Sequence, residues 1–349
     1  MDKLKSVFLD VCRLIAALIV VYGHGMDFFF PNHNKDPRLL YNMAHFAVVI
    51  FFVLSGYVIG YTTKSNNRGP FKYALARFSR LTSVVIPALI FTFIVEISLS
   101  YLSPHFITEF QRGVSTPRYF ISASFLNEIW YFSSAPPLNR PLWSVSFEFF
   151  FYFIFGVYFF TKKFKLKVIF TCIACLIAGP KILILFPIWI AGYMAYNYSS
   201  TCVKIKNFYL FFISTLFIYA SYLYVGPIPF KIGNKPFYFA NQFVTDWITG
   251  FLFAFSLWVF PEKCFFEIPD LWVKVIRKIA DFTFPIYVLH YPTILFCKGA
   301  LVVGLSVKAQ FYVSMSLALA VSILLGHIFE TYRYLWRNFF SFLFYKLKK

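Results

Sequence analysis

The sequence predicts an all-α, polytopic integral membrane bundle, and three observations carry that prediction. Of the 349 residues, 60% are hydrophobic and only 13% are charged, and 50 are phenylalanine. Apolar segments of about 20 residues recur along the chain, which is the length a helix needs to cross a bilayer. Basic residues gather in alternate loops, a pattern that reflects membrane topology. The net charge of +19 therefore indicates orientation in a membrane, and nucleic acid is not an expected partner.

Hydropathy predicts about ten transmembrane helices within a single domain, residues 1–349, that has no fused soluble domain. The fifth and sixth helices share one apolar stretch, and Gly179 and Pro180 mark the turn between them. The first apolar run is too long for a cleaved signal peptide. The predicted spans lie near 6–30, 43–62, 81–101, 142–160, 166–180, 182–198, 208–225, 244–260, 282–303 and 310–330.

The loop charges predict the orientation of these spans. One side of the membrane holds 22 of the 33 lysines and arginines and the other side holds 9. The rich side is expected to be cytoplasmic, so both termini are predicted to lie in the cytoplasm. The longest loop, 102–141, is then external. It is rich in serine, proline and aromatic residues, and we expect it to be ordered.

The first predicted span carries three ionisable residues, Asp10, Arg13 and His24. Asp10 and Arg13 are three residues apart and can pair. Arg13 and His24 are eleven residues apart, close to three helical turns, so they share one face at a separation of roughly 16 Å along the axis. Asp10 and Arg13 could instead be interface residues, and His24 could make a structural hydrogen bond between helices. Otherwise one face carries polar groups across much of the membrane, which usually indicates a functional cavity.

Other spans add polar side chains in apolar surroundings. Glu148 lies among phenylalanines, and His290 lies in the middle of the ninth span; both need a partner or a wet cavity. Glu96 and Asp246 lie nearer to span ends, where an interface position explains them equally well.

Small residues and cysteines have simpler interpretations. Ser55 and Gly56 in the second span allow close helix packing, which explains them as well as a functional role does. Cys172 and Cys175 form a C-x-x-C without a histidine or a second pair, so a packed helix face is favoured over a metal or redox site. No metal site and no bound cofactor are expected.

Five segments, taken together and in order, resemble the membrane-bound acyltransferase-3 family. They cover most of the chain, and the set is far more specific than any one motif. They are LDVCRLIAALIVVYGH with Asp10, Arg13 and His24; FFVLSGYVIG with Ser55 and Gly56; RFSRLTSVVIP with Arg77, Arg80 and Pro87; LWSVSFEFFFY with Trp143, Ser144 and Glu148; and FPIYVLHYP with Tyr287 and His290.

The resemblance implies an integral membrane O-acyltransferase, most often an O-acetyltransferase. It implies acyl-CoA, commonly acetyl-CoA, as the cytoplasmic donor substrate. The implied acceptor is a hydroxyl of a cell-envelope polysaccharide, such as O-antigen, or of a lipid-linked sugar. The implied location is the bacterial inner (cytoplasmic) membrane. Val11 and Cys12 stand where members often have a small residue, with no evident consequence.

Chemical roles for the motif residues follow from this resemblance and from general chemistry. A sugar hydroxyl is a poor nucleophile and needs a base, and histidine titrates near neutral pH, so we expect His24 to be the base. Glu148 is expected to orient His24 or to contact the acceptor. Arg13 could bind a donor oxygen or hold Asp10.

Arg77 and Arg80 are expected to bind the donor phosphates, because a guanidinium fork suits phosphate. They could instead serve only as cytoplasmic positive charges. Trp143, Ser144, Tyr287 and His290, like Ser55 and Gly56, are assigned to a pocket or to helix packing.

Two alternatives remain open at this point. Transfer through a covalent acyl-histidine is as compatible with these residues as direct transfer is. A transporter or flippase of a lipid-linked sugar or a small anion would also need intramembrane charges. That class predicts paired inverted repeats, and none is evident. The acceptor hydroxyl, the acyl chain and the oligomeric state do not follow from the sequence.

Overall fold

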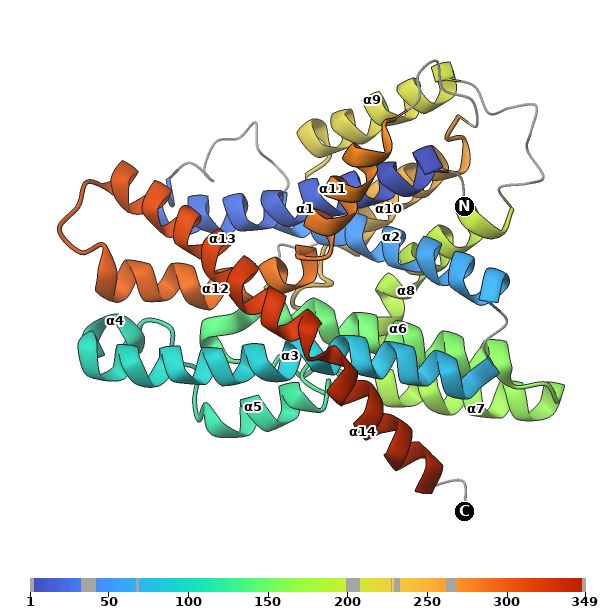
Figure 1. Ribbon diagram of the computed structural model, residues 1–349, viewed down its shortest axis with the longest axis horizontal. Helices are drawn as coiled ribbons and strands as arrows, with labels where there is room; N and C mark the ends of the chain where they lie inside the picture. Colours follow the sequence, from blue (N-terminus) through green and yellow to red (C-terminus); the bar gives the residue numbers. More distant parts are fainter. Residues whose placement is uncertain are drawn as a thin grey trace. The chain divides into compact units, whose positions relative to one another are not determined.

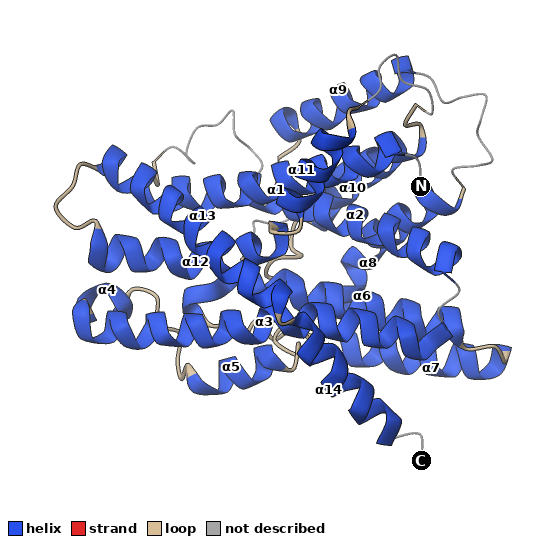
Figure 2. Cartoon of the chain, viewed as in Figure 1, coloured by secondary structure: helices blue, strands red, loops and turns tan. Residues whose placement is uncertain are grey.

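The computed structural model describes residues 3–32, 42–66, 69–198, 208–226, 228, 233–261 and 268–346. Within these ranges every regular element is a helix, and no β-strand occurs (Figure 2). Cys202, Cys264 and the loop cations Lys35, Arg38, Arg68, Lys204, Lys206, Lys231, Lys263, Lys348 and Lys349 lie outside the described residues. The prediction of an all-α bundle is confirmed.

The helices follow the predicted spans and add several elements between them. The elements are α1 (Lys3–Phe29), α2 (Met43–Asn66), α3 (Gly69–Leu102), α4 (Pro104–Thr108), α5 (Thr116–Ala123), η2 (Pro137–Leu142), α6 (Trp143–Phe160), α7 (Phe164–Ala178), α8 (Pro180–Asn197), α9 (Phe208–Tyr224), α10 (Phe243–Trp258), α11 (Asp270–Ala280), α12 (Thr283–Phe296), η3 (Cys297–Leu301), α13 (Val307–Thr331) and α14 (Arg333–Lys346).

Length and composition identify the helices that can cross a bilayer. Four described helices meet both criteria, and up to six spans result if each of two bent helix pairs counts as one. The bent pairs are α7 with α8 and α11 with the α12–η3 segment, and α9 and α10 are shorter apolar helices. The count of ten spans and the cytoplasmic termini stay predictions.

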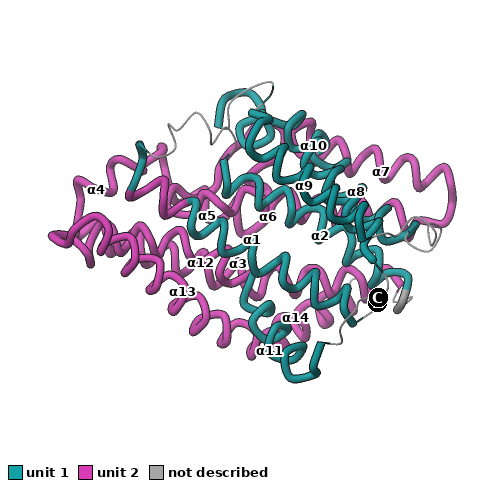
Figure 3. Tube along the Cα trace, turned by 90° about the horizontal axis from the view of Figure 1, so that it is seen from above, with its two compact units in different colours: residues 1–23, 30–67, 183–283 teal, residues 24–29, 68–182, 284–349 magenta. Residues whose placement is uncertain are grey.

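The chain folds into two compact units (Figure 3). Unit 1 contains residues 1–23, 30–67 and 183–283, and unit 2 contains residues 24–29, 68–182 and 284–349. Helices α1 and α8 pass from one unit into the other. The two units are described separately below.

In unit 1, α10 packs against α2 and α9, and small residues bring α2 onto α8. The indole nitrogen of Trp189 donates to the Ser55 hydroxyl at 3.1 Å. A Cβ atom at Gly56 would lie only 1.9 Å from the Trp189 carbonyl oxygen, and one at Gly192 only 2.0 Å from that of Val53. Glycine is therefore required at both positions, and the packing interpretation of Ser55 and Gly56 gains direct support.

In unit 2, the long helix α3 is central. It contacts α4, α5, α6, α13 and α14 (Figure 1). A buried cluster near its C-terminal end includes Leu99 of α3, Leu138 of η2, and Tyr291 and Leu295 of α12. Side chains from distant parts of the sequence thus converge where the chain leaves α3 and returns through η2.

The predicted external loop is ordered, as expected. It forms α4, α5 and η2, and a buried ion pair fixes the segment between α5 and η2. The Lys181 ammonium group bonds to Glu128 and to the carbonyl of Phe132, and the Ser133 hydroxyl donates to Glu128 at 3.1 Å. Lys181 and Glu128 are both fully buried. Burial raises the pKa of Glu128 to about 7, while the ammonium group of Lys181 lowers it.

The turn predicted at Gly179 and Pro180 separates α7 from α8. Gly179 has φ +82°, and a Cβ there would lie 2.6 Å from the Trp130 backbone. The Trp130 amide donates to the carbonyl of Ala178 at 3.1 Å. The chain bends by 119° at this break, so the pair is either a broken span or a re-entrant loop.

Candidate active site

Two histidines from distant parts of the chain meet in unit 2. Nδ1 of His24, near the end of α1, lies 2.9 Å from Nε2 of His290 on α12. Their rings are nearly parallel, with an interplanar angle of 17°. The edge of the Tyr291 ring packs against His24, with centroids 5.1 Å apart. His290 is fully buried, and His24 is partly exposed. His290, which the sequence assigned to a pocket or to helix packing, is therefore the ring partner of the predicted base.

A proline in α12 explains how this helix is held beside α3. Pro292 has no amide hydrogen, so the carbonyl of Val288, four residues earlier, loses its usual helical donor. The side-chain amide of Asn139 donates to that carbonyl at 2.9 Å and to the Thr92 hydroxyl of α3 at 3.0 Å. Asn139 is fully buried in η2. Asn139 was not among the residues predicted from the sequence, and the available signal was the proline inside an apolar span.

One turn before His290, a tyrosine connects α12 to α6. The Tyr287 hydroxyl lies 2.9 Å from the carbonyl oxygen of Pro141 and 2.7 Å from the Ser144 hydroxyl, and the Ser144 hydroxyl lies 3.3 Å from the same carbonyl. Either hydroxyl can donate to that carbonyl while accepting from the other. Ser144 and Tyr287 are buried, and Trp143 packs beside them against Phe147. The Trp-Ser and Tyr-x-x-x-His motifs thus form one contact.

Helix α6 continues this set of polar side chains. Ser144, Glu148 and Tyr152 are four residues apart in sequence and therefore lie along one helix face, over roughly 12 Å. The Tyr152 hydroxyl donates to the Glu148 carboxylate. The Arg77 guanidinium of α3 lies over the Tyr152 ring, 5.6 Å from its centroid. We call the set from Arg77 through Tyr152, Glu148, Ser144, Tyr287 and His290 to His24 the polar row.

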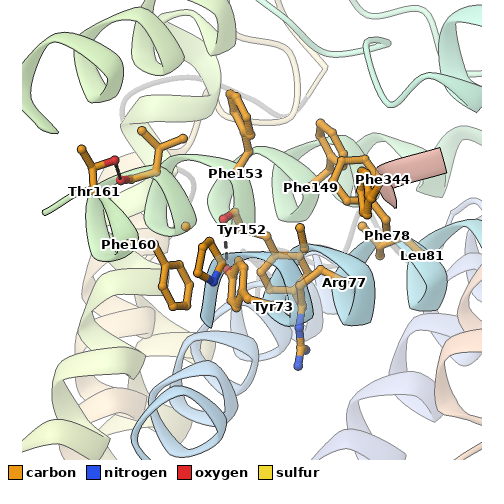
Figure 4. Close-up of a pocket in the computed structure, with 14 residues that line it drawn as sticks. Tyr73, Arg77, Phe78, Leu81, Phe149, Tyr152, Phe153, Phe160, Thr161 and Phe344 are labelled. Carbon is orange, nitrogen blue, oxygen red and sulfur yellow. Dashed lines mark hydrogen bonds between the residues drawn. The ribbon is translucent and has the colours of Figure 1, made fainter. Parts of the chain in front are cut away.

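Beside Arg77, α3, α6 and α14 enclose an apolar groove of about 450 Å³. Figure 4 shows Tyr73 and Arg77 of α3 on one side of it and Phe153 of α6 on the other. The Arg77 Nε atom is buried without a hydrogen-bond partner among the described residues. A buried donor of this kind favours binding of an anion or another acceptor.

A third arginine, which the sequence analysis missed, belongs to this region. Phe340 and Phe344 of α14 pack on Phe78 of α3, with centroids 5.8 and 6.0 Å apart. Arg333, the first residue of α14, pairs with Glu330 at 3.3 Å. Burial lowers the pKa of Arg333, Glu330 raises it, and the neighbouring guanidinium groups of Arg80 and Arg77 lower it further. The amphipathic segment after the last span was the available signal.

In unit 1, the first-span pair forms as the sequence predicted. Arg13 lies 3.5 Å from Asp10, and both side chains are mostly buried. Burial of both groups argues against simple interface residues.

Unit 1 also contains a second buried histidine, which the sequence analysis did not select. His45 Nε2 lies 2.9 Å from Asp246 Oδ1, and Gln242 approaches the same carboxylate at 3.5 Å. Asp246 is fully buried within the protein. In unit 2, Glu96 of α3 accepts a hydrogen bond from Tyr119 of α5 at 2.5 Å.

Comparison with known proteins decides the family. The model of a family described as "Acyltransferase domain", the acyltransferase-3 family, matches residues 6–345. This protein belongs to the acyltransferase-3 family. The family expected from the five motifs is thereby confirmed, and the apolar helices agree with a multi-pass membrane protein.

A curated relative supports the assignment weakly. "Protein 2 in picA locus" of Rhizobium radiobacter is 29% identical over 117 residues, which are 32% of this chain and 52% of the relative. The acyltransferase thus aligns with about half the length of that protein. No solved structure matches.

In this acyltransferase, the motif residues divide between the two units. Unit 2 brings together His24, Arg77, Ser144, Glu148, Tyr152, Tyr287 and His290. Unit 1 contains Asp10, Arg13, Ser55 and Gly56. Glu148 accepts a hydrogen bond from Tyr152, and its expected role, to orient His24 or to contact the acceptor, stays a prediction.

Proposed function

We propose that this enzyme is an acetyl-CoA-dependent O-acetyltransferase of a cell-envelope polysaccharide or lipid-linked sugar, located in the bacterial inner membrane. Acyl-CoA is its donor substrate, and no resident cofactor takes part. The observation that carries the proposal is the polar row, because it joins a histidine able to act as a base to an arginine beside an apolar groove. The family membership supports acyl transfer, and the residue chemistry supports the choice of a hydroxyl acceptor.

His24 supplies the base. Its ring accepts the proton of the acceptor hydroxyl as the hydroxyl oxygen attacks the thioester carbonyl carbon. The new C–O bond forms as the C–S bond breaks, and the departing coenzyme thiolate takes up the proton held by His24. In the covalent variant, a nitrogen of His24 attacks the thioester carbonyl carbon, so that a C–N bond forms as the C–S bond breaks and the coenzyme leaves as its thiolate. The sugar oxygen then attacks the same carbon, the C–N bond breaks, and the hydroxyl proton passes to the thiolate.

Arg77 and Arg80 bind the anionic end of the donor. A guanidinium group stays charged and binds phosphate through two parallel N–H donors. The Nε atom of Arg77 is buried without a partner among the described residues. The guanidinium groups of Arg77 and Arg80 also lie near that of Arg333. Both observations favour binding of an anion at this place. The nucleotide stays at these arginines while the thin acyl-pantetheine arm reaches toward His24.

Purified protein reconstituted with radiolabelled acetyl-CoA tests the proposal. We expect release of coenzyme A and labelling of the acceptor glycan only when both substrates are present. His24→Ala is the matched inactive control. Label that crosses the membrane unchanged, without thioester cleavage, would contradict the proposal and favour a transporter.

A further inference from the structure

The hydrogen bonds of His290 determine which nitrogen of His24 carries a proton. Nδ1 of His290 lies 3.0 Å from the carbonyl oxygen of Ile286. A carbonyl oxygen can only accept, so Nδ1 of His290 must carry the hydrogen. In a neutral imidazole the other nitrogen, Nε2, then has a lone pair and is an acceptor.

The neutral form of His290 follows from its surroundings. Its side chain is fully buried. Its contacts among the described residues are His24, the Ile286 carbonyl and the rings of Tyr287 and Tyr291. None of these is a carboxylate, and an unpaired charge buried in such a place is costly.

The donor in the contact between the two rings is therefore His24. Its Nδ1–H donates to Nε2 of His290 at 2.9 Å. N–H bonds and lone pairs lie in the ring plane, so the 17° angle between the rings suits a nearly straight bond. Nε2 of His24 is left with its lone pair, and it makes no hydrogen bond to any described residue.

We propose that His290 is a positioning residue that holds His24 as the Nδ1–H tautomer, so that Nε2 of His24 is the atom that takes the acceptor's proton. The role parallels that of an orienting carboxylate in a catalytic triad, but a neutral imidazole performs it. The relay from Ile286 through His290 to His24 uses each donor and acceptor once. The catalytic part of this inference rests on the proposed function, whereas the tautomer does not.

Nitrogen-15 spectroscopy of histidine-labelled protein in bilayers tests the tautomer without any activity measurement. We expect one neutral histidine with a protonated Nδ1 and a bare Nε2 whose signal disappears in His24→Gln. In His290→Leu the same signal should shift, because the acceptor is gone. A His24 signal with a protonated Nε2 in the unsubstituted protein would overturn the proposal, whatever reaction the enzyme catalyses.

Kinetics of two substitutions at one position test the catalytic consequence. His290→Gln can place an amide oxygen near the former Nε2 and accept from His24, so it should keep most of kcat. His290→Leu fills similar space without an acceptor. We expect it to lose about 10²–10⁴-fold in kcat, the range reached when an orienting group is removed, with little change in the KM for acyl-CoA.

Thr293→Val is the matched control, because Thr293 is buried on the same helix and, among the residues that the structure describes, its hydroxyl bonds only to the Leu289 carbonyl. It should leave kcat near that of the unsubstituted enzyme. Equal losses in His290→Gln and His290→Leu, or near-normal kcat in folded His290→Leu, would refute the positioning role. An inactive unsubstituted enzyme would count against the proposed function instead, and the spectroscopic result would still decide the tautomer.

Discussion

Individual polar residues in this enzyme are best understood by following their hydrogen bonds. Asn139 replaces the donor that Pro292 removes, and the hydroxyls of Ser144 and Tyr287 bond to each other and share the Pro141 carbonyl as acceptor. Tracing each donor and acceptor is informative in a membrane protein, because burial of a polar group without a hydrogen bond there costs roughly several kcal/mol of free energy. It leaves His24 Nε2 as a lone pair without a donor among the described residues, which is the property that a base requires.

Substitution of His24 by glutamine separates a base from a structural hydrogen bond. Glutamine can still donate to His290, but it cannot accept a proton at neutral pH. We expect His24→Gln to be as inactive as His24→Ala, a loss of about 10²–10⁴-fold or more, with normal protein level and detergent-solubilised behaviour. A structural bond is worth only about 0.6 kcal/mol on average in membranes. Near-normal acylation by folded His24→Gln would therefore defeat the mechanism.

Lysine substitutions test the arginines of the donor region. Arg80→Lys and Arg333→Lys keep the charge but lose the planar fork, so each should raise the KM for acyl-CoA and leave the acceptor KM unchanged. Arg337→Lys, an exposed position on α14, is the control and should change neither constant. Initial rates over a grid of both substrate concentrations provide the measurement. Equal changes in both constants would favour a purely topological role for Arg80.

At the scale of the elements, the apolar segments of the sequence predicted the main helices. Local turn residues determine where some of these helices end. The break at Gly179 and Pro180 was predictable, because the two residues are local turn signals. The buried partner of Lys181 was not predictable. Pairing of Lys181 with Glu128 depends on a contact across 53 residues, and neither position has a distinctive local pattern.

The buried ion pair should make the stability of the external loop sensitive to pH. Lys181→Met removes the group that lowers the pKa of Glu128, so this pKa should rise above about 7. A carboxyl group with a raised folded pKa stabilises the fold fully below its unfolded value, near 4.5, and loses that contribution as pH rises through the folded value. Lys181→Met should therefore be destabilised by about 3–5 kcal/mol where Glu128 is charged, and by less at pH 5.

Thermal unfolding in detergent at pH 5 and pH 8.5 measures this difference. The paired substitution Glu128→Leu with Lys181→Met should recover most of the lost stability, because no charge is left buried. An apparent Tm of Lys181→Met that does not depend on pH would contradict the coupling.

At the scale of the whole molecule, the five motifs predicted the family, because each motif preserves local residue types at fixed spacing. Which of the motif residues lie beside one another was harder to predict from the sequence. The sequence offered Glu148 as a group that orients His24 or contacts the acceptor, and it did not predict that His290 lies beside His24 or that Tyr152 bonds to Glu148. Helical periodicity defines which residues share a face, but which faces meet depends on packing between distant helices. Arg333 and His45 were missed for the same reason.

Membrane orientation is the prediction on which the donor side depends. The excess of lysine and arginine places the N-terminal part of α3 inside and the loop 102–141 outside. A cysteine introduced at Val114, an exposed loop position, should react with an impermeant thiol reagent in intact cells. A cysteine at Lys72, also exposed, should react only after the cells are opened, and the parent protein controls for its native cysteines. Because CoA is cytoplasmic, Arg77 and Arg80 can meet it only in this orientation. The reverse labelling pattern would place them outside and remove the proposed donor site.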